Sequence, residues 1–294
     1  MLTICTIIPT HNRKKYLKII LNQLENQEMI DKIINHIIVV NDGSTDGTDE
    51  MLKNNFSEVH IVKGTGDWWY TKSMNEGFKF AEQFQPDYIL TLNDDVEIKK
   101  NYINSILEDI KKVETDSIMG TVSFTISKPH RISFGGIYKF DFWRLKEHHY
   151  FSKYSQRTPS SLSGIKTSVI LPARGMLISY KVLKKLNYFD EKFIQYGSDT
   201  DFTLRASRSG IKVYISYNSV IFENEELTSN GAAHNTPTFI QYIKSYFNIY
   251  STNSIQKTFY FWKKHGIIIL IPIYIVILIL GFFKVYYFKY RMKI

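Results

Sequence analysis

The sequence has one cysteine, Cys5, among 294 residues. A single thiol cannot form a disulfide within the chain or build a thiolate zinc site, so both are excluded. The N-terminus also lacks the basic start and the small-residue cleavage site of a secretory signal. We therefore expect residues 1–9 to form the first strand of a domain that folds in a reducing compartment.

Two further patterns are missing. The first predicted strand is not followed by the G-x-G-x-x-G turn that lets a backbone approach a dinucleotide, which argues against a dehydrogenase or another enzyme built on that turn. His148 and His149 are adjacent but have no carboxylate cluster beside them, so they do not indicate a metal site.

The overall composition is that of a folded protein that favours anionic partners. Hydrophobic residues make up 44% of the chain and charged residues 22%, which argues against long disordered tracts. The 37 Lys and Arg residues outnumber the 28 Asp and Glu residues and give a net charge of +9. This excess favours phosphates, nucleic acid or acidic lipid surfaces without choosing among them.

An uncharged apolar run occupies residues 266–283 near the C-terminus. As a helix it would be about 27 Å long, close to the roughly 30 Å thickness of a bilayer's hydrocarbon core. Aromatic residues flank it on both sides, as membrane interfaces favour. We expect a C-terminal hydrophobic membrane helix; the alternatives are a buried core helix and a segment that only dips into the membrane, bent at Pro272. The aromatic and basic stretch at 239–262 then suits a membrane approach better than nucleic acid.

The first 115 residues alternate strand-like and helical segments, which predicts an α/β fold with a mostly parallel sheet flanked by helices. The expected strands cover residues 3–8, 36–40, 59–62 and 88–92. Leu17, Ile20, Leu21 and Leu24 repeat at helical spacing and mark a helix between the first two strands.

Beyond residue 116 the pattern loosens. It predicts a hairpin around Gly135 and Gly136, a polar loop over 146–168, helices over 180–186 and 201–209, and a strand over 212–217. We expect three parts: a nucleotide-sugar-binding half at 1–115, an acceptor-binding half with the catalytic base at 116–235, and a basic aromatic segment with the membrane anchor at 236–294.

Polar side chains follow the predicted strands, where open α/β sheets bind their ligands. Thr10 and Asn12 follow the first strand and can either meet an anion or cap a helix. Asp42 follows the second strand and can either bind a base or ribose or stabilise its own turn.

Carboxylates come in pairs at two later positions. Asp94 and Asp95 follow the fourth strand, and such neighbours repel unless a cation joins them. Mg²⁺ or Mn²⁺ that is also bound to a diphosphate needs one or two protein carboxylates. The alternative role for this pair is to cap a helix. Asp199 and Asp201 lie at the start of a predicted helix, where one can cap and the other can act as a general base.

Four motifs in this order resemble the inverting family 2 glycosyltransferases with the GT-A fold, over residues 3–233. They read IIPTHNR from Ile7, VVNDGSTDGT from Val39, LNDDVE from Leu92, and RGMLISYKVLKKLNYFDEKFIQYGSDTDFTLRA from Arg174.

The resemblance implies a role for each matching position. Asp95 is similar to the family's metal ligand for Mn²⁺ or Mg²⁺, and Asp199 to its catalytic base, with Asp201 as the other candidate. Acceptor binding falls to Arg174, Gly175, Ser198 and Asp201. Donor binding falls to Pro9, Thr10, Asn12, Arg13, Asp42, Gly66, Asp67, Trp69, Lys72, Asn75, Asn93 and Asp94.

The sequence departs from the family pattern in three places. Ser198 stands where Glu is usual before the base. The third segment, GTGDWWYTKSMNEG from Gly64, carries bulky residues that narrow the donor pocket. A downstream metal-binding histidine is matched only loosely, by His234 or by Glu223, and an exposed loop histidine explains His234 equally well.

The expected activity is transfer of a sugar from a UDP- or dTDP-sugar to a hydroxyl of a glycan or lipid-linked acceptor. The setting implied by the family is synthesis of bacterial O-antigen, capsule or lipopolysaccharide at the cytoplasmic face of the membrane, without nucleic acid. The alternative is a catalytically silent, membrane-bound homologue that only binds carbohydrate or nucleotide-sugar.

Overall fold

The computed structural model describes residues 1–28, 32–144, 146–152, 155–224 and 239–287. The chain forms two compact units, one made of Met1–Lys139 with His149–Asn224 and the other of Phe140–His148 with Glu225–Ile294. The first unit contains the central sheet and every described residue of the candidate site. The expected division at residues 115 and 235 stays a prediction.

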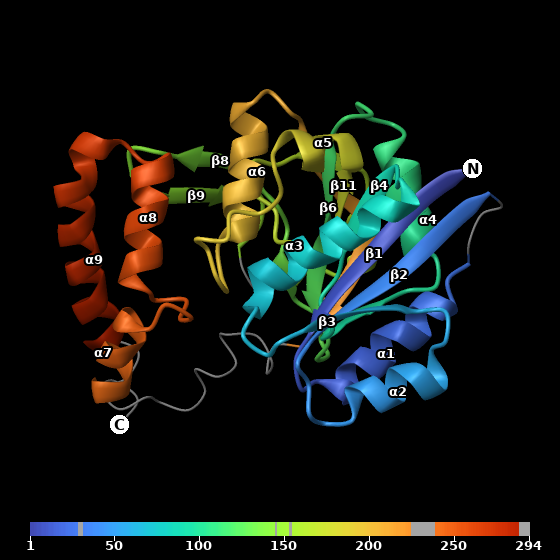
Figure 1. The fold of residues 1–294 in the computed structure, drawn as a ribbon. Coiled ribbons are helices and arrows are strands. Elements are labelled where there is room, and N and C mark those ends of the chain that lie inside the picture. The colour runs from blue at the N-terminus through green and yellow to red at the C-terminus, as the bar shows by residue number, and fades with distance from the viewer. Residues whose placement is uncertain (29–31, 145, 153–154, 225–238, 288–294) are drawn as a thin grey trace. The chain divides into compact units, whose positions relative to one another are not determined.

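A four-stranded parallel sheet forms the N-terminal half of the first unit, in the order β4-β1-β2-β3 (Figure 1). The strands are β1 (Leu2–Thr10), β2 (Ile33–Asp42), β3 (His60–Gly64) and β4 (Tyr88–Thr91). All four predicted strands are present. Because they are parallel neighbours, their carboxyl ends meet at one edge of the sheet.

The second half extends the same sheet and makes it mixed. β11 (Met176–Ser179) runs antiparallel between β4 and β6 (Ile118–Thr125), and β12 (Val213–Glu223) pairs in parallel with β6. β5 (Val96–Ile98), β7 (Ile132–Phe134) and β10 (Ile165–Thr167) complete a ten-stranded sheet. The predicted α/β class is confirmed, although the sheet is mixed rather than mostly parallel.

Helices cover both faces of the sheet. α1 (Lys14–Glu25), α2 (Thr48–Asn55) and α4 (Tyr102–Ile110) pack into one apolar cluster, and α3 (Trp69–Ala81), α5 (Tyr180–Lys185) and α6 (Ser198–Arg208) into the other. Leu17, Ile20, Leu21 and Leu24 of α1 are buried, as their spacing predicts. The two helices of the predicted acceptor half, α5 and α6, are also confirmed.

Gly77 lets α3 lie close against the sheet. A Cβ atom at this position would come within 2.5 Å of Ile7 Cγ2 and 3.0 Å of Val40 Cγ2, which no side chain tolerates without a shift. This close approach to β1 and β2 fixes where the first turn of α3 lies, at the edge of the sheet where the strands end.

Cys5 lies in the middle of β1 and is fully buried. Burial raises the pKa of its thiol to about 12. At pH 8 only about one thiol in 10⁴ would then be ionised, and the thiolate is the reactive form. We predict no reaction with a disulfide reagent such as DTNB in the native protein and one equivalent after unfolding in guanidinium. Rapid labelling of the native chain would contradict this packing.

The hairpin predicted around Gly135 and Gly136 is wrong. β7 pairs with β6, whereas β8 (Ile137–Asp141) pairs with β9 (Lys146–His149), so the hairpin lies one strand later. A Cβ atom at Gly135 would come within 2.5 Å of Phe151 Cδ2. The small residue here serves close packing rather than a turn. The predicted polar loop over 146–168 also contains strands β9 and β10.

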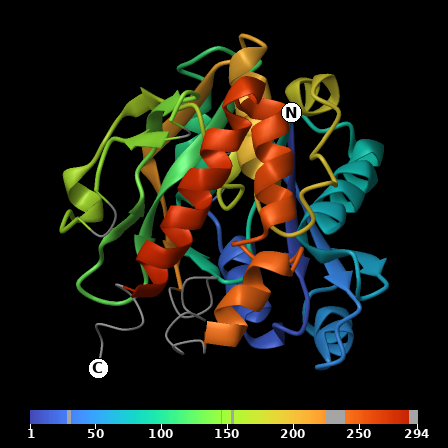
Figure 2. The ribbon, with the colours of Figure 1, turned by 90° about the vertical axis from the view of Figure 1, so that its left-hand side faces the viewer.

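The second unit contains α7 (Phe239–Phe247), α8 (Ile255–His265) and α9 (Ile271–Tyr286). Ser254 caps α8 by accepting from the backbone N–H of Lys257 at 3.3 Å. α8 and α9 lie side by side in both views (Figure 1 and Figure 2), with the rings of Trp262 and Tyr274 centred 5.3 Å apart.

The apolar run at 266–283 is not one helix. Gly266 is extended and ends α8, a 3-10 turn covers Ile268–Leu270, and α9 begins at Ile271 with Pro272 in its first turn. Proline favours that place because it has no N–H to donate. Over the described part of the chain, none of the helices combines the length and the apolar character that crossing a bilayer requires. The predicted C-terminal membrane helix is therefore unsupported.

Candidate active site

The ends of β1 and β4 bring together the first predicted donor residues. Thr10 Oγ1 donates to Asp94 Oδ2 at 2.8 Å. Arg13 Nη1 lies 3.1 Å from Asp94 Oδ1 and 2.8 Å from Asp95 Oδ2, so one guanidinium spans both carboxylates. These residues are more than 80 positions apart in the sequence, and the parallel pairing of β1 with β4 joins them.

Asp94 is the more strongly buried of the two carboxylates, with 5% of its side chain exposed. Burial raises its pKa to about 6; the charge of Arg13 opposes this rise, and the charge of Asp95 adds to it. Between about pH 4 and pH 6 the folded protein therefore holds a proton at Asp94 that an unfolded carboxyl group would release.

We predict from this shift that Asp94→Asn makes the protein more stable at pH 8. The folded pKa lies above the unfolded value, so the favourable contribution of protonated Asp94 is present at low pH and is lost as the pH rises through about 6. The gain for Asn should be on the order of 2 kcal/mol at pH 8 and near zero at pH 4. Chemical denaturation of both proteins in EDTA measures it; an equal gain at both pH values would contradict this origin.

Asp42 at the end of β2 organises the turn before α3. Its Oδ1 accepts the backbone N–H of Gly66 at 2.7 Å, and its Oδ2 accepts those of Trp68 and Trp69, each at 3.0 Å. Gly43 faces Gly66 so closely that a Cβ atom on Gly43 would lie 2.7 Å from Gly66 Cα. The turn-stabilising interpretation of Asp42 is therefore what the contacts show, and its role toward a nucleoside stays a prediction.

Two residues at the same edge have left-handed backbones without being glycine. Asn12 has φ of 53°, donates its N–H to Ser44 Oγ at 2.9 Å and accepts from the N–H of Thr45 at 2.7 Å. Trp69 has φ of 56° and is 39% exposed. Such strained residues persist only where neighbouring contacts hold them, and they concentrate at binding sites. Trp69 therefore presents an aromatic ring from a fixed backbone position.

The other predicted donor residues lie near the ends of the strands, except for Asn75, whose amide is bound within the protein. Lys72 lies over the Trp68 ring at 5.2 Å, Asp67 is held by the hydroxyl of Thr65, and Asn93 is half-buried beside Asp94. Pro9 is a residue of β1 paired with Val40. Asn75, in contrast, is buried. Its Nδ2 donates to the carbonyl of Phe189 at 3.0 Å, and its Oδ1 accepts the N–H of Phe189 at 3.1 Å. Its contacts are structural.

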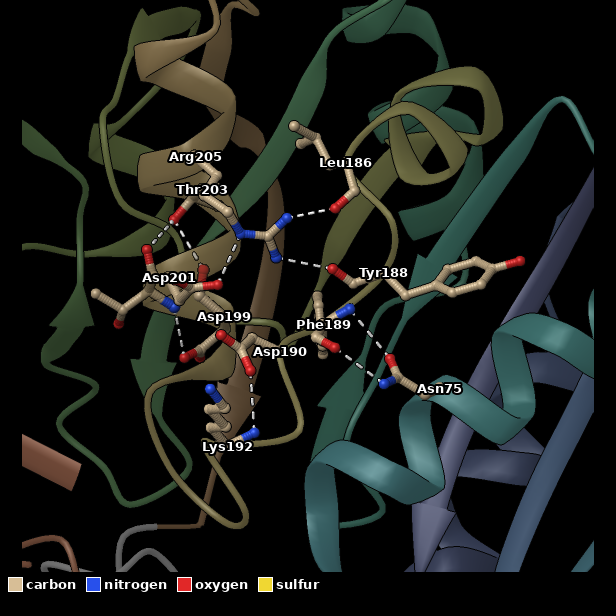
Figure 3. Close-up of polar contacts among 11 residues, drawn as sticks. Asn75, Leu186, Tyr188, Phe189, Asp190, Lys192, Asp199, Asp201, Thr203 and Arg205 are labelled. Carbon is tan, nitrogen blue, oxygen red and sulfur yellow. Dashed lines mark hydrogen bonds and ion pairs between the residues drawn. The ribbon is translucent and has the colours of Figure 1, made fainter. Parts of the chain in front are cut away.

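The two candidate bases both lie on α6 (Figure 3), and they differ in burial. Asp201 is fully buried, and its Oδ2 accepts from Arg205 Nε at 2.8 Å. Asp199 is half-buried and accepts the backbone N–H groups of Ala173 at 3.2 Å and Thr200 at 2.8 Å. Asp199 is therefore the more accessible of the two carboxylates, which favours it as the base over the fully buried Asp201.

The predicted acceptor residues surround the start of β11. Arg174 Nε is paired with Glu223 Oε2 at 2.6 Å, and Gly175, with φ of 77°, turns the chain into β11. Ser198 is buried, and its hydroxyl has no hydrogen-bond partner within the described segments. Glu223 is thus engaged by Arg174, and His234 lies outside the described residues.

Tyr70 is one of the bulky residues predicted to narrow the donor pocket, but the sequence predicted no further role for it. It is half-buried on the first turn of α3. Its pKa is raised well above the usual value, first by burial and then by the charge of Asp199; Arg174 lowers it and Asp95 raises it further. The charges of Asp199, Arg174 and Asp95, three residues predicted for the site, therefore all act on this phenol. Its position directly after two tryptophans was the available signal.

The carboxylates at the end of β4 are the residues that suit a divalent ion. No group of three or more His, Cys, Asp or Glu side chains that could hold a metal occurs in the described part of the chain. A two-carboxylate set still fits Mg²⁺ or Mn²⁺ bound together with a diphosphate, because phosphate oxygens and water supply the remaining ligands. The negative charge of Asp94 and Asp95, now compensated by Arg13, is consistent with that fit.

The fold is an α/β sheet with charged and polar side chains gathered where its parallel strands end, and Asp199 is the more accessible of the two candidate bases. Residues 5–174, more than half of the chain, match the model of the glycosyl transferase family 2. The chain belongs to this family and is a glycosyltransferase.

Similar proteins agree with this family. S. aureus TarS 1-349 has a TM-score of 0.55 at 16% identity, covering 89% of this chain and 72% of that chain, and its complex with UDP-GlcNAc has 0.54 at 17%, covering 83% and 64%. At such identity the likeness shows the fold alone. A 53-residue stretch is 45% identical to abequosyltransferase RfbV of Salmonella typhimurium strain LT2, but spans only 17% of this chain and 16% of that relative.

Proposed function

We propose that this glycosyltransferase moves a sugar from a UDP- or dTDP-sugar to a hydroxyl of a glycan or lipid-linked acceptor, with inversion. The observation that carries the proposal is that Thr10, Arg13, Asp94 and Asp95 meet where the parallel strands end. Asp95 and the half-buried carboxylate of Asp199 also both act electrostatically on Tyr70. The setting we propose is bacterial surface polysaccharide synthesis, on the likeness to RfbV and TarS.

Asp199 has the geometry of the base in a single displacement. Its carboxylate takes the proton of the acceptor hydroxyl while that oxygen bonds to the anomeric carbon, and the bond from that carbon to the diphosphate breaks. The N–H groups of Ala173 and Thr200 orient the carboxylate through hydrogen bonds. Attack opposite the leaving group inverts the anomeric configuration.

Asp94 and Asp95 would hold Mn²⁺ or Mg²⁺, which supplies positive charge against the leaving diphosphate. Arg13 already compensates part of the negative charge of both carboxylates. The donor nucleoside is proposed to lie over the ends of β1 and β2, beside Asn12 and Trp69. TarS has been crystallised with UDP and with UDP-GlcNAc, which supports a uridine diphosphate donor here.

A thermal-shift screen tests the proposal with UDP, dTDP, GDP, CMP and NAD, each with and without Mn²⁺. A ligand that binds only the folded state raises its apparent stability. We expect UDP or dTDP to raise Tm only when Mn²⁺ is present. Asp95→Ala should abolish the metal-dependent part, and Glu108→Ala, at an exposed carboxylate on α4, should preserve it.

Other outcomes of the screen are informative. Stabilisation by NAD alone, or by none of the ligands, would contradict a nucleotide-sugar enzyme. Stabilisation by UDP or dTDP without nucleotide release from any sugar donor would instead favour a catalytically silent homologue that only binds.

We further propose that the second unit attaches the enzyme to the cytoplasmic face of the membrane along the surface of α9. Ile273, Val276 and Leu280 repeat at helical spacing and expose 54%, 54% and 63% of their surface. Lys263 and Lys264 lie in the last turn of the neighbouring helix α8, and their positive charge would favour anionic lipid. Replacing the three apolar residues by Ser should reduce co-sedimentation with phosphatidylglycerol vesicles; undiminished binding would refute this attachment.

A further inference from the structure

The segment between α5 and α6, residues 186–197, lies between the donor helix α3 and the helix that carries Asp199. We call it the α5–α6 segment. It is attached to α3 on one side and to α6 on the other, by contacts that use the backbone of the segment (Figure 3).

The attachment to α3 runs along the first two turns of that helix. Asn75 exchanges two hydrogen bonds with the backbone of Phe189, at 3.0 Å and 3.1 Å. Thr71 donates its N–H to the carbonyl of Ile194 at 3.0 Å and its hydroxyl to that of Phe193. The N–H of Tyr70 is bound by Gln195 Oε1 at 3.0 Å. The helix that presents Trp69 and Tyr70 is thereby fixed to the segment over its whole donor-facing end.

The attachment to α6 comes from one arginine. Arg205 donates Nε to buried Asp201 at 2.8 Å, Nη2 to the carbonyl of Tyr188 at 2.8 Å and Nη1 to the carbonyl of Leu186 (Figure 3). Asn187 and Tyr188 have φ of 54° and 62°, a conformation that two consecutive non-glycine residues adopt only when their surroundings hold them. The guanidinium fork binds the carbonyl on each side of this strained pair.

Phe189 joins the two attachments through the core. Its ring meets that of Phe78 on α3 edge-on at 5.1 Å and that of Phe202 on α6 at 5.2 Å, and it is 3% exposed. Interiors packed this tightly transmit displacement instead of absorbing it. A shift of α3 is therefore passed to the first turn of α6, where Asp199 lies.

We propose that Asn75 and Arg205 are positioning residues that lock the α5–α6 segment and so fix the distance between Asp199 and the donor. This inference rests on the proposed function, with Asp199 as the base. Both side chains are engaged within the protein, Asn75 by Phe189 and Arg205 by Asp201 and two carbonyls of the segment. Their effect should fall on turnover and not on donor binding, since a misplacement of about 1 Å costs up to 10²-fold in rate.

The test uses Asn75→Ala and Arg205→Lys. The lysine can keep the ion pair with Asp201 but cannot reach both carbonyls, so the buried carboxylate is not left alone. Lys79→Ala is the matched control, because Lys79 is exposed on α3 and ion-paired with Glu76 of the same helix, while its charge acts on Glu191 and Tyr188 of the segment only through space. Each folded variant is assayed for nucleotide release from a panel of UDP- and dTDP-sugars and for UDP affinity with Mn²⁺.

We expect both variants to lower kcat about 10- to 100-fold while the Kd for UDP stays within about threefold of the wild-type value, and Lys79→Ala to match the wild type. Unchanged kcat in folded protein, or a parallel loss of UDP affinity, would overturn the proposal.

Hydrogen exchange separates this inference from the proposed function, because it needs no substrate. In Asn75→Ala the amides of the α5–α6 segment and of residues 198–203 should exchange at least about tenfold faster than in Lys79→Ala. Faster exchange confined to the segment, with α6 unaffected, would overturn the coupling even if the wild type released no nucleotide from any donor tested.

Discussion

Asp199→Asn is expected to lower turnover roughly 10²- to 10⁴-fold while leaving UDP affinity unchanged. Asparagine keeps the shape, and its single carbonyl oxygen can still accept the N–H of Thr200 at the start of α6, although the N–H of Ala173, which binds the other carboxylate oxygen, loses its acceptor. It cannot take a proton from the acceptor. The effect should therefore appear in kcat, measured as nucleotide release from the preferred donor.

Asp201 provides a contrast to this substitution. Asp201→Asn alters a carboxylate of the same helix that is buried against Arg205. It should lower the free energy of unfolding, while the kcat of the enzyme that remains folded falls far less than in Asp199→Asn. If Asp199→Asn retained wild-type turnover, or if the two variants exchanged their phenotypes, the assignment of the base would be wrong.

Arg205→Met is expected to destabilise the protein by about 3–5 kcal/mol, because it leaves Asp201 charged and fully buried without its cation. The carbonyls of Leu186 and Tyr188 lose their donors at the same time. For a chain of this size such a loss should lower Tm by about 10 °C, which differential scanning calorimetry measures.

The double variant Asp201→Asn with Arg205→Met tests the electrostatic part of this expectation. With no buried charge left, it should recover a substantial part of the lost stability. A fall in Tm of less than about 2 °C for Arg205→Met, or a double variant less stable than the sum of both single changes, would show that the ion pair is not what holds this region.

The sequence was sufficient for the N-terminal half of the fold because its signals are local. Four apolar strands and the helix bearing Leu17 and Leu24 were predicted by periodicity, and the polar residues that follow the strands do meet at one edge of the sheet. Thr10, Arg13, Asp94 and Asp95 lie together as that rule requires.

What could not be predicted depends on contacts between distant residues. Asn75 binds Phe189 across 114 positions, and nothing near Asn75 distinguishes a structural amide from one that binds a ligand. Asp199 and Asp201 have the same side chain, and only their burial separates the base from a partner of Arg205. The break at Gly266 depends on local backbone geometry, so an apolar run alone overestimates the helix.

The antiparallel strand β11 has a consequence for how substrates enter. It is hydrogen-bonded to β4 on one side and β6 on the other, so the half proposed to bind the donor and the half proposed to carry the base share one continuous sheet. Because the sheet is continuous across the boundary between these two halves, we expect no hinge motion that would open one half away from the other. We therefore expect substrate access to depend on the turns at the edge of the sheet, among them the turn before α3 that Asp42 holds.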